Sequence, residues 1–397
     1  MALQIHFHLV QSVAESLDEI FFNKKYADKV IEKCFKNNRK WGSRDRKFFA
    51  ETIYEIVRHK RRLEFVVNSD NSWDLIAAYL IQTAGELPDW PEFEHLKVSD
   101  LKIKNSAEKS PEVANSFPDW LNELGQTEFG PEWNKMMNVL NMPAEVFLRV
   151  NTLKTDTDTL IVELAHEDIQ AEKVFDACVK LSKRKNVFIT QAFKKGLFEV
   201  QDAGSQLIAP LLEVTPGLRV ADTCAGAGGK SLHLASLMKN KGKIISMDIH
   251  EWKLKELKIR AARDGVDIIE TKLIESSKTM KRLENSFDRV LLDVPCSGLG
   301  VLRRNPDTKW KLSLEEIKRL TDLQKEIMSQ YSKICKTGGI MVYATCSILH
   351  RENEEQVKWF LDSEIGKHWS LKKELRVWPH IEKFDGFYAA VMVKNKL

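Results

Sequence analysis

The sequence contains no apolar run long enough to cross a bilayer, no disulfide framework and little excess of one charge. A membrane-spanning helix needs about 20 consecutive apolar residues, and this 397-residue chain, 43% hydrophobic and 30% charged, has no such run. We therefore expect no membrane association. The six cysteines include no Cys-x-x-Cys pair, which argues against a disulfide scaffold or a metal site. Free thiols are typical of a reducing compartment, so the sequence predicts a cytoplasmic protein.

The net charge of +4 is small, but the basic residues are concentrated. Residues 24–62 carry 14 Lys and Arg against 5 Asp and Glu, a net +9, so the rest of the chain carries −5. A second basic cluster contains Lys180, Lys183, Arg184, Lys185, Lys194 and Lys195. Clustered basic side chains suit a phosphate-backbone partner, whereas any single run fits a solvated helix face equally well. Two clusters favour a nucleic-acid partner.

The apolar pattern divides the chain into four predicted segments. Residues 1–85 show helical periodicity, and residues 86–143 combine a linker with further helices. Residues 144–200 alternate strand-like and helical runs, including a strand predicted at 187–189, which indicates a small α+β module. In residues 201–397 strands and helices alternate, as in a doubly wound, Rossmann-like α/β domain. The strands expected in that domain are 218–222, 243–248, 287–293, 340–344 and 386–393.

A glycine-rich turn follows the first predicted strand of this domain. It contains Cys224, Ala225, Gly226, Ala227, Gly228, Gly229 and Lys230. Glycines let the backbone approach a ligand closely, and the helix that follows presents free N–H groups. Asp248 ends the next strand, where an acidic side chain can accept hydrogen bonds from the ribose of an adenosine. The two features predict a nucleotide-type cofactor site. The glycine string alone fits a nicotinamide dehydrogenase equally well, and a tight structural turn without a ligand is the other interpretation.

Two cysteines follow later predicted strands. Cys296 ends the string Asp293-Val294-Pro295-Cys296, and Cys346 lies in Thr345-Cys346-Ser347. Ligands of open α/β sheets bind at the carboxyl ends of the strands, so the two thiols could converge on one substrate. Either cysteine alone fits core packing as well. Together, beside a cofactor loop, they indicate group transfer with covalent catalysis.

These motifs resemble the RsmB/Sun family of RNA 5-methylcytosine methyltransferases, which use S-adenosylmethionine. Further matches are Gln201-Asp202, the run from Gly300 to Asp307, Trp310, Leu323-Gln324, Glu352-Asn353 and Asp385-Gly386-Phe387. The resemblance implies a class I methyltransferase fold for 201–397, an RNA-recognition-like module for 144–200 and a NusB-like RNA-binding region for 1–85. One departure is the pair Gly226-Ala227, where the family usually has Ala-Pro.

The resemblance also implies a role for each site residue. Cys346 is expected to attack carbon 6 of cytosine, Cys296 to assist product release, and Asp293 to hydrogen-bond the cytosine edge. S-adenosylmethionine is expected to contact Cys224, Ala225, Gly226, Ala227, Gly228, Gly229, Lys230, Asp248, Asp293 and, on the adenine side, Glu275.

The string Gly42-Ser43-Arg44-Asp45-Arg46, with Tyr54 and Arg58, resembles the family's NusB-like domain. That resemblance favours small-subunit ribosomal RNA as the substrate, with transfer RNA left open, and we expect a monomer. Three other classes stay in view. A DNA cytosine-5 methyltransferase would use the cysteine after proline, Cys296, as its nucleophile. A dehydrogenase would need neither thiol, and a non-catalytic ribosome-assembly factor would bind RNA without using them.

Overall fold

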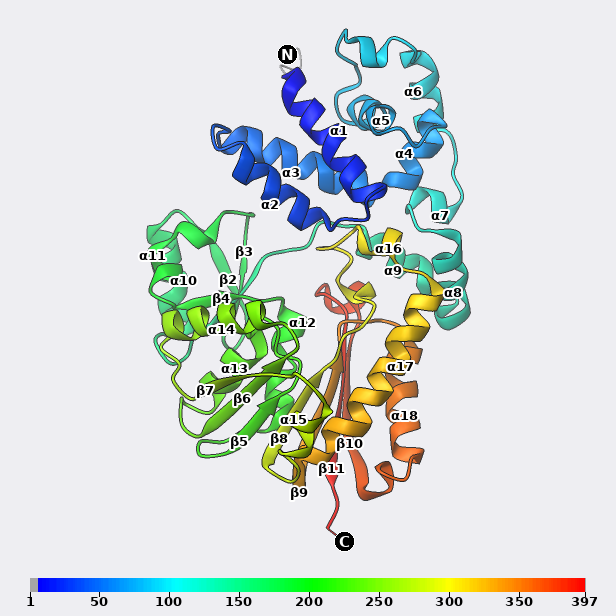
Figure 1. The fold of residues 1–397 in the computed structure, drawn as a ribbon. Helices are drawn as coiled ribbons and strands as arrows, with labels where there is room; N and C mark the ends of the chain where they lie inside the picture. Colours follow the sequence, from blue (N-terminus) through cyan, green and yellow to red (C-terminus); the bar gives the residue numbers. More distant parts are fainter. Residues whose placement is uncertain (1–5, 397) are drawn as a thin grey trace. The chain divides into compact units, whose positions relative to one another are not determined.

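The structure is a computed structural model that describes residues 6–396 and divides into two compact units (Figure 1). The first unit contains the chain up to Pro143 together with Leu302–Leu314, and the second contains Ala144–Val301 and the chain from Glu315 onward. Residues 1–5 of the predicted 1–85 region lie outside the described residues. Within 6–396, no helix has the length and apolar character that a membrane crossing requires.

The first unit is built from helices. They are α1 (Phe7–Phe21), α2 (Ala27–Asn37), α3 (Ser43–Arg58), α4 (Lys60–Val67), α5 (Ser72–Ala84), η1 (Pro91–Phe93), α6 (Val98–Ser106), α7 (Pro111–Ala114), α8 (Asp119–Phe129), α9 (Glu132–Leu140) and α16 (Thr308–Lys311). The apolar faces of α1 to α5 share one core. Leu87, Trp90 and Phe93 pack against the same core, so the chain after α5 is part of this unit.

Residues 302–314 come from the part of the sequence predicted to form the Rossmann-like domain, but they pack in the helical unit. Lys309, only 1% exposed, donates from Nζ to the carbonyl oxygen of Arg58 at 2.9 Å. The indole of Trp310 donates to the carbonyl oxygen of Val57 at 2.7 Å. Burial lowers the pKa of Lys309 well below its usual value. The chain therefore leaves the second unit after Val301, packs in the helical unit over Leu302–Leu314, and re-enters the second unit at Glu315.

The second unit begins with a four-stranded antiparallel sheet of order β2-β3-β1-β4. Its elements are β1 (Phe147–Val150), α10 (Thr157–His166), β2 (Ala171–Phe175), β3 (Cys178–Leu181), η2 (Val187–Ile189), α11 (Gln191–Lys194) and β4 (Phe198–Val200). The strand predicted at 187–189 is wrong, because this segment is a 3₁₀ turn. The side chain of Asn186 accepts the N–H of Phe188 at 3.1 Å and starts that turn, and Phe188 itself is exposed.

A seven-stranded sheet of order β10-β11-β9-β8-β5-β6-β7 forms the rest of the unit. Its strands are β5 (Arg219–Asp222), β6 (Lys243–Asp248), β7 (Ile269–Leu273), β8 (Phe287–Asp293), β9 (Cys335–Thr345), β10 (Trp369–Val377) and β11 (Phe387–Lys394). Strands β5 to β9 run parallel, and β11 is antiparallel to both β9 and β10. The predicted Rossmann-like domain is confirmed, although the list of expected strands lacked β7 and β10.

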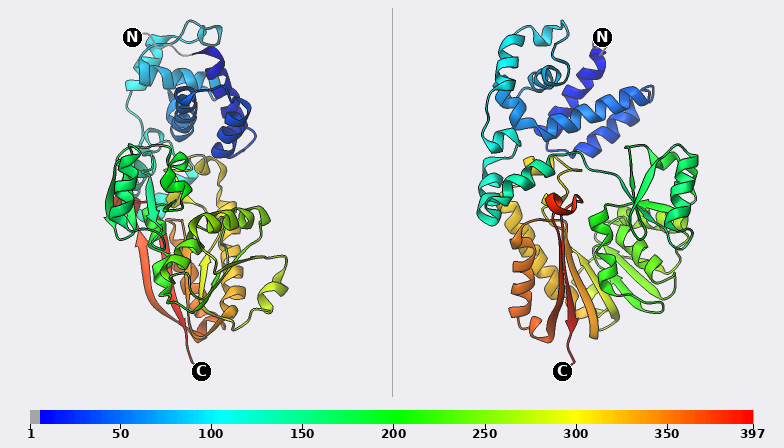
Figure 2. Two further views of the ribbon diagram at one scale, coloured as in Figure 1. Left: turned by 90° about the vertical axis from the view of Figure 1, so that its left-hand side faces the viewer. Right: turned by 180° about the vertical axis from the view of Figure 1, so that it is seen from behind.

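Helices cover both faces of this sheet (Figure 2). The connecting elements are α12 (Ala203–Gln206), η3 (Ala209–Leu212), α13 (Gly229–Leu237), α14 (Glu251–Asp264), α15 (Ser277–Lys281), η4 (Leu299–Val301), α17 (Leu314–Tyr331), η5 (Ser332–Ile334), η6 (His350–Glu352), α18 (Glu354–Asp362), η7 (Gly366–His368) and α19 (Pro379–Glu382). Met328 of α17 and Val357 of α18 pack on one face, and Leu234 of α13 and Leu257 of α14 pack on the other. The strand order reverses at β5. The carboxyl ends of β5, β6, β8 and β9 therefore lie together, on the side where open α/β sheets bind their ligands.

Candidate active site

The glycine-rich turn leaves β5 and enters α13 with two residues in the left-handed region. Gly226 has φ +55° and Gly228 has φ +88°, which residues with a side chain rarely adopt. A Cβ on Gly228 would lie 1.9 Å from Cδ1 of Leu257, whereas a Cβ on Gly226 would meet nothing within 4 Å. The loop is therefore packed tightly against α14 at Gly228 and open beside Gly226, as a ligand cradle requires.

Asp248 ends β6 directly beside this loop. Its Oδ2 accepts the N–H of Gly226 at 2.9 Å, and its Oδ1 accepts the N–H of His250 at 2.8 Å. Each carboxylate oxygen keeps a second lone pair, so Asp248 can still accept a ligand hydroxyl. Glu275 follows β7 and is exposed. The N–H of Ile274 donates to the carbonyl oxygen of Asp248 at 3.0 Å, which brings the chain before Glu275 to the same edge.

The two predicted thiols meet at the exits of β8 and β9. Sγ of Cys296 lies 3.1 Å from Sγ of Cys346, and the N–H of Cys346 donates to Sγ of Cys296 at 3.2 Å. The hydrogen bond to Cys346, burial and the charge of Glu352 raise the pKa of Cys296 well above its usual value. Cys296 therefore keeps its proton and can donate it to the sulfur of Cys346.

An ion pair connects the glycine loop to this thiol pair. Nζ of Lys230 lies 2.6 Å from Oδ2 of Asp293, and their side chains are 11% and 27% exposed. Burial acts against the charge of Lys230, but Asp293 and the sulfur of Cys346 favour it and raise the pKa of the lysine. A fixed positive charge thus lies beside the thiols, with a partly open carboxylate next to it.

Glu352 links the two cysteine loops, a role that the sequence did not reveal. It is fully buried, and its Oε1 accepts the N–H of Ser297 at 2.8 Å and the side-chain amide of Gln324 at 3.0 Å. Its Oε2 accepts the hydroxyls of Ser297 and Ser347. Both serines directly follow a cysteine, so this carboxylate fixes the two loops relative to each other. The sequence analysis identified Glu352 and Gln324 only as residues shared with the family, and it predicted no contact between them.

Asp222, the last residue of β5, is buried, and Cys224 at the start of the loop is half-buried. Oδ2 of Asp222 accepts the hydroxyl of Ser231 at 2.7 Å, while its Oδ1 is buried without a protein partner. Burial raises the pKa of Asp222 to about 7. Burial also raises the pKa of Cys224, whose side chain packs against the core on the α17 face. Cys224 is thus poorly suited to act as a nucleophile.

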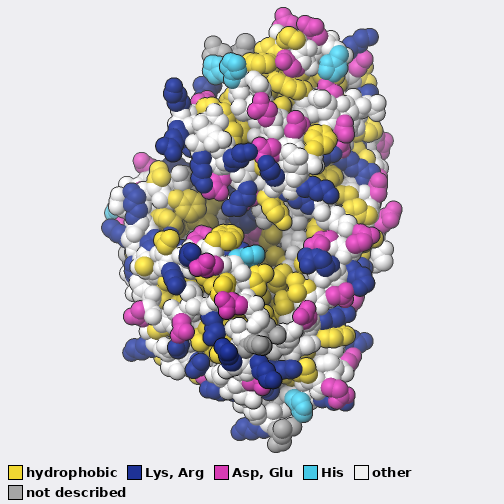
Figure 3. Space-filling view, in the orientation of Figure 1, with side chains coloured by type: hydrophobic (Ala, Val, Ile, Leu, Met, Phe, Trp, Pro, Cys, Tyr) yellow, Lys and Arg dark blue, Asp and Glu magenta, His cyan; other side chains and the backbone are white. Residues whose placement is uncertain are grey.

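The basic stretch 24–62 has two parts in the structure. The exposed basic residues are Lys24, Lys25, Lys29, Lys33, Lys36, Arg39, Lys40, Arg44 and Lys47, and Lys and Arg side chains gather over α2 and α3 in Figure 3. Arg58 is 3% exposed and donates to the carbonyl oxygen of Arg303 at 3.2 Å. Arg61 donates to the carbonyl oxygen of Phe117 at 2.5 Å. The end of the stretch therefore stabilises the helical unit. In the described residues, no cluster of His, Cys, Asp and Glu with metal-binding geometry occurs.

The sheet order defines a Rossmann-like domain, and the comparisons with known families assign the protein to the methyltransferases. The family model for the 16S rRNA methyltransferase RsmB/F matches residues 209–393, and the model for the RsmF/B-like ferredoxin-like domain matches residues 117–188. The chain is 35% identical over 438 residues to a probable ribosomal RNA small subunit methyltransferase B of Bacillus subtilis (strain 168), covering 96% of this chain and 97% of that protein. It belongs to the RsmB/Sun family.

Two further comparisons support the same architecture. A probable ribosomal RNA small subunit methyltransferase B of Synechocystis sp. (strain ATCC 27184 / PCC 6803 / Kazusa) is 34% identical over 304 residues, covering 70% of this chain and 67% of that protein. The crystal structure of PH0851 matches with a TM-score of 0.81 and 25% identity, covering 99% of this chain and 100% of that chain. Neither names the helical unit, so its assignment as NusB-like stays a prediction.

Proposed function

We propose that this methyltransferase transfers a methyl group from S-adenosylmethionine to carbon 5 of a cytosine in small-subunit ribosomal RNA. The observation that carries the proposal is the 3.1 Å approach of the Cys296 and Cys346 sulfurs at the ligand-binding edge of the sheet. A dehydrogenase has no use for such a pair. The names of the relatives from Bacillus subtilis and Synechocystis favour ribosomal RNA as the substrate over transfer RNA.

The thiols suit covalent catalysis on a cytosine ring. Carbon 5 is a weak nucleophile, and addition of the Cys346 thiolate to carbon 6 converts the ring to an enamine that is a stronger one. S-adenosylmethionine supplies the methyl group that carbon 5 then takes. Loss of the carbon-5 proton to solvent returns the electron pair to the ring and breaks the bond between Cys346 and carbon 6. Cys296 assists this release, because its proton can be donated to the departing sulfur.

The remaining site residues bind and orient the cytosine and the cofactor. Asp293 accepts a hydrogen bond from the cytosine amino group, and Lys230 holds that carboxylate in place through its 2.6 Å ion pair. The open space beside Gly226 and the unpartnered Oδ1 of Asp222 suit a polar ligand such as S-adenosylmethionine. Residues 224–230 form its cradle, and Asp248 accepts the ribose hydroxyls.

Two further assignments complete the cofactor and RNA sites. Glu275 is the acidic residue on the adenine side of the cofactor. The helical unit acts as a NusB-like RNA-binding region through the exposed basic face of α2, and the protein works as a monomer. The target base must leave its stack to reach the thiols, since both are partly buried in the protein.

The test is transfer of labelled methyl groups from S-adenosylmethionine to total RNA of cells that lack the gene, followed by bisulfite sequencing. We expect one small-subunit cytosine to become protected in the presence of the protein. Label in transfer RNA alone would move the substrate assignment to transfer RNA. RNA binding without any label would support the non-catalytic assembly factor instead.

A further inference from the structure

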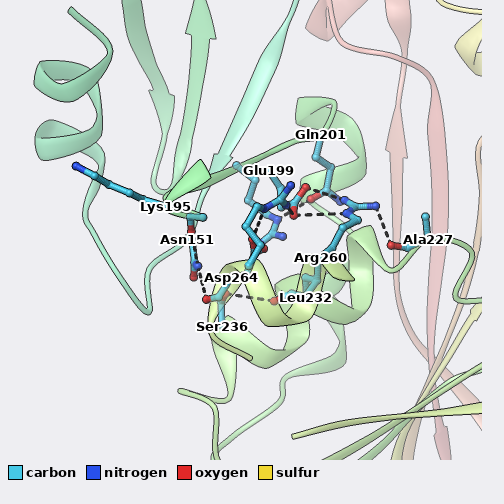
Figure 4. Close-up of polar contacts among 12 residues, drawn as sticks. Asn151, Lys195, Glu199, Gln201, Ala227, Leu232, Ser236, Arg260 and Asp264 are labelled. Carbon is cyan, nitrogen blue, oxygen red and sulfur yellow. Dashed lines mark hydrogen bonds and ion pairs between the residues drawn. The ribbon is translucent and has the colours of Figure 1, made fainter. Parts of the chain in front are cut away.

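A buried ion-pair network joins the α+β module to α14 (Figure 4). Glu199 of β4 is 3% exposed, and its Oε2 accepts from Nη2 of Arg260 at 2.8 Å. Arg263 pairs with the other oxygen of Glu199, and its guanidinium lies 4.0 Å from the ring centroid of Phe193. Burial acts against the charge of Glu199, but the two arginines outweigh it and lower the pKa of this carboxyl. Glu199 is therefore ionised inside the fold and pairs with both arginines.

Side chains of the same module also hold the end of α14, by hydrogen bonds to its backbone carbonyl oxygens. Nδ2 of Asn151 donates to the carbonyl oxygen of Asp264 at 2.9 Å. Nζ of Lys154 donates to the carbonyl oxygen of Arg263 at 2.7 Å. Both donors follow β1, so the C-terminal turn of α14 is held by side chains of the module. The unsatisfied carbonyls of a helix end are suitable acceptors for such donors.

Arg260 also reaches the cofactor loop. Its Nη1 donates to the carbonyl oxygen of Ala227 at 2.8 Å, and Ala227 lies between the two positive-φ glycines, Gly226 and Gly228. The planar fork of a guanidinium can bind a carboxylate and a carbonyl at once, which a lysine ammonium cannot match in geometry. One side chain thus connects Glu199 of the module to the loop residue between the two positive-φ glycines.

We propose that Arg260 is a positioning residue that holds the cofactor loop in its binding shape and makes cofactor affinity depend on the docking of the α+β module. The identity of the cofactor rests on the function proposed above. Without Arg260 the loop samples more conformations, and apparent affinity falls in proportion to the population that remains competent to bind. The module therefore prepares the cofactor site as well as contributing to the fold.

The test compares Arg260→Met, Arg260→Lys and Glu199→Gln in the full chain. Calorimetry with S-adenosylhomocysteine, which carries no methyl group to transfer, should show Kd raised about 10-fold in both Arg260 variants and a few-fold in Glu199→Gln. The Arg260→Met/Glu199→Gln double variant should bind like Arg260→Met, because both changes break one connection. In turnover, KM for S-adenosylmethionine should rise while kcat at saturation stays within about 2-fold.

Lys258→Met is the matched control, since Lys258 is exposed on the same helix. Hydrogen exchange of residues 224–230 gives a second measurement that needs no ligand. It should be faster in Arg260→Met and Glu199→Gln and unchanged in Lys258→Met. Wild-type affinity and unchanged exchange in Arg260→Met would overturn the inference. Failure of the wild-type chain to bind S-adenosylhomocysteine would instead count against the proposed function, while the exchange data would still decide the role of Arg260.

Discussion

Sγ of Cys296 lies 3.1 Å from Sγ of Cys346, although 50 residues separate them in the sequence. The parallel pairing of β8 and β9 produces this approach, because Asp293 stands opposite Ala344 in the register and each cysteine follows within three residues. The hydrogen bond to Cys346 also raises the pKa of Cys296, so Cys296 keeps its proton. This contact leads to a prediction about which sulfur bonds to RNA.

Cys346→Ala should abolish methyl transfer and give no covalent RNA complex, because the sulfur that attacks carbon 6 is missing. Cys296→Ala should accumulate a protein–RNA adduct that resists denaturant and runs as a slow band on a gel. The double variant should give no band, since the adduct needs the attacking thiol. A band from Cys346→Ala and none from Cys296→Ala would reverse the two roles, as in the DNA-type arrangement. Normal turnover by both single variants would exclude covalent catalysis.

Asp248→Asn should weaken binding of S-adenosylmethionine by about 1.5–3 kcal/mol, the range for hydrogen bonds to a charged group. The amide keeps the size of the side chain but replaces one acceptor oxygen by a donor. Isothermal calorimetry measures the loss, and Asp267→Asn on the exposed turn after α14 is the control. Equal affinities for the wild type and Asp248→Asn would remove Asp248 from the cofactor site.

Replacing Arg39, Lys40 and Arg44 by glutamate should weaken RNA binding and flatten its dependence on salt, because fewer counterions are released. These three side chains are exposed between α2 and the start of α3, unlike Arg58 and Arg61, which stabilise the helical unit. Reversal of Lys239 and Lys241, exposed at the turn before β6, and of Lys243, the exposed first residue of β6, is the control. An identical salt slope for the two triple variants would mean that the surface formed by Arg39, Lys40 and Arg44 is merely solvated.

Glu352→Ala should lower the free energy of unfolding by about 3 kcal/mol, because Ser297, Gln324 and Ser347 lose a buried charged acceptor. Glu352→Gln should retain more stability yet reduce kcat, since the two cysteine loops are no longer held by one carboxylate. Urea titration and single-turnover methylation measure the two effects. Full activity in Glu352→Gln would show that the thiols keep their geometry without this charge.

Much of the catalytic domain could be predicted because its strands are short apolar runs that end in polar residues. The strands at 243–248 and 287–293 were predicted with the observed bounds, and both end in an aspartate at the site. Contacts that depend on tertiary structure could not be read in this way. Glu352 accepts hydrogen bonds from serines 5 and 55 residues away. No local sequence pattern predicts a contact of this kind. Charge counting likewise did not reveal that Arg58 is buried.

The pKa of Asp222 leads to a pH dependence of stability with an unusual sign. Burial raises this pKa to about 7, above the value near 4 of an unfolded aspartate. Between about pH 4 and pH 7 the folded chain holds a proton that the unfolded chain has lost. The contribution of Asp222 to stability is thus fully present below about pH 4 and is lost as pH rises through about 7.

Asp222→Asn should remove this contribution, because the amide is neutral at every pH and can still accept the hydroxyl of Ser231. Between about pH 5 and pH 7 its free energy of unfolding should fall less steeply than that of the wild type, by up to about 1.4 kcal/mol per pH unit. Urea titrations at several pH values measure the difference between the two proteins, which cancels the contributions of other carboxyls. Asp267→Asn, at an exposed position, should follow the wild type. Parallel curves for Asp222→Asn and the wild type would mean that Asp222 is already ionised in the folded protein at pH 5. Such a result would require a positive charge or water beside its Oδ1.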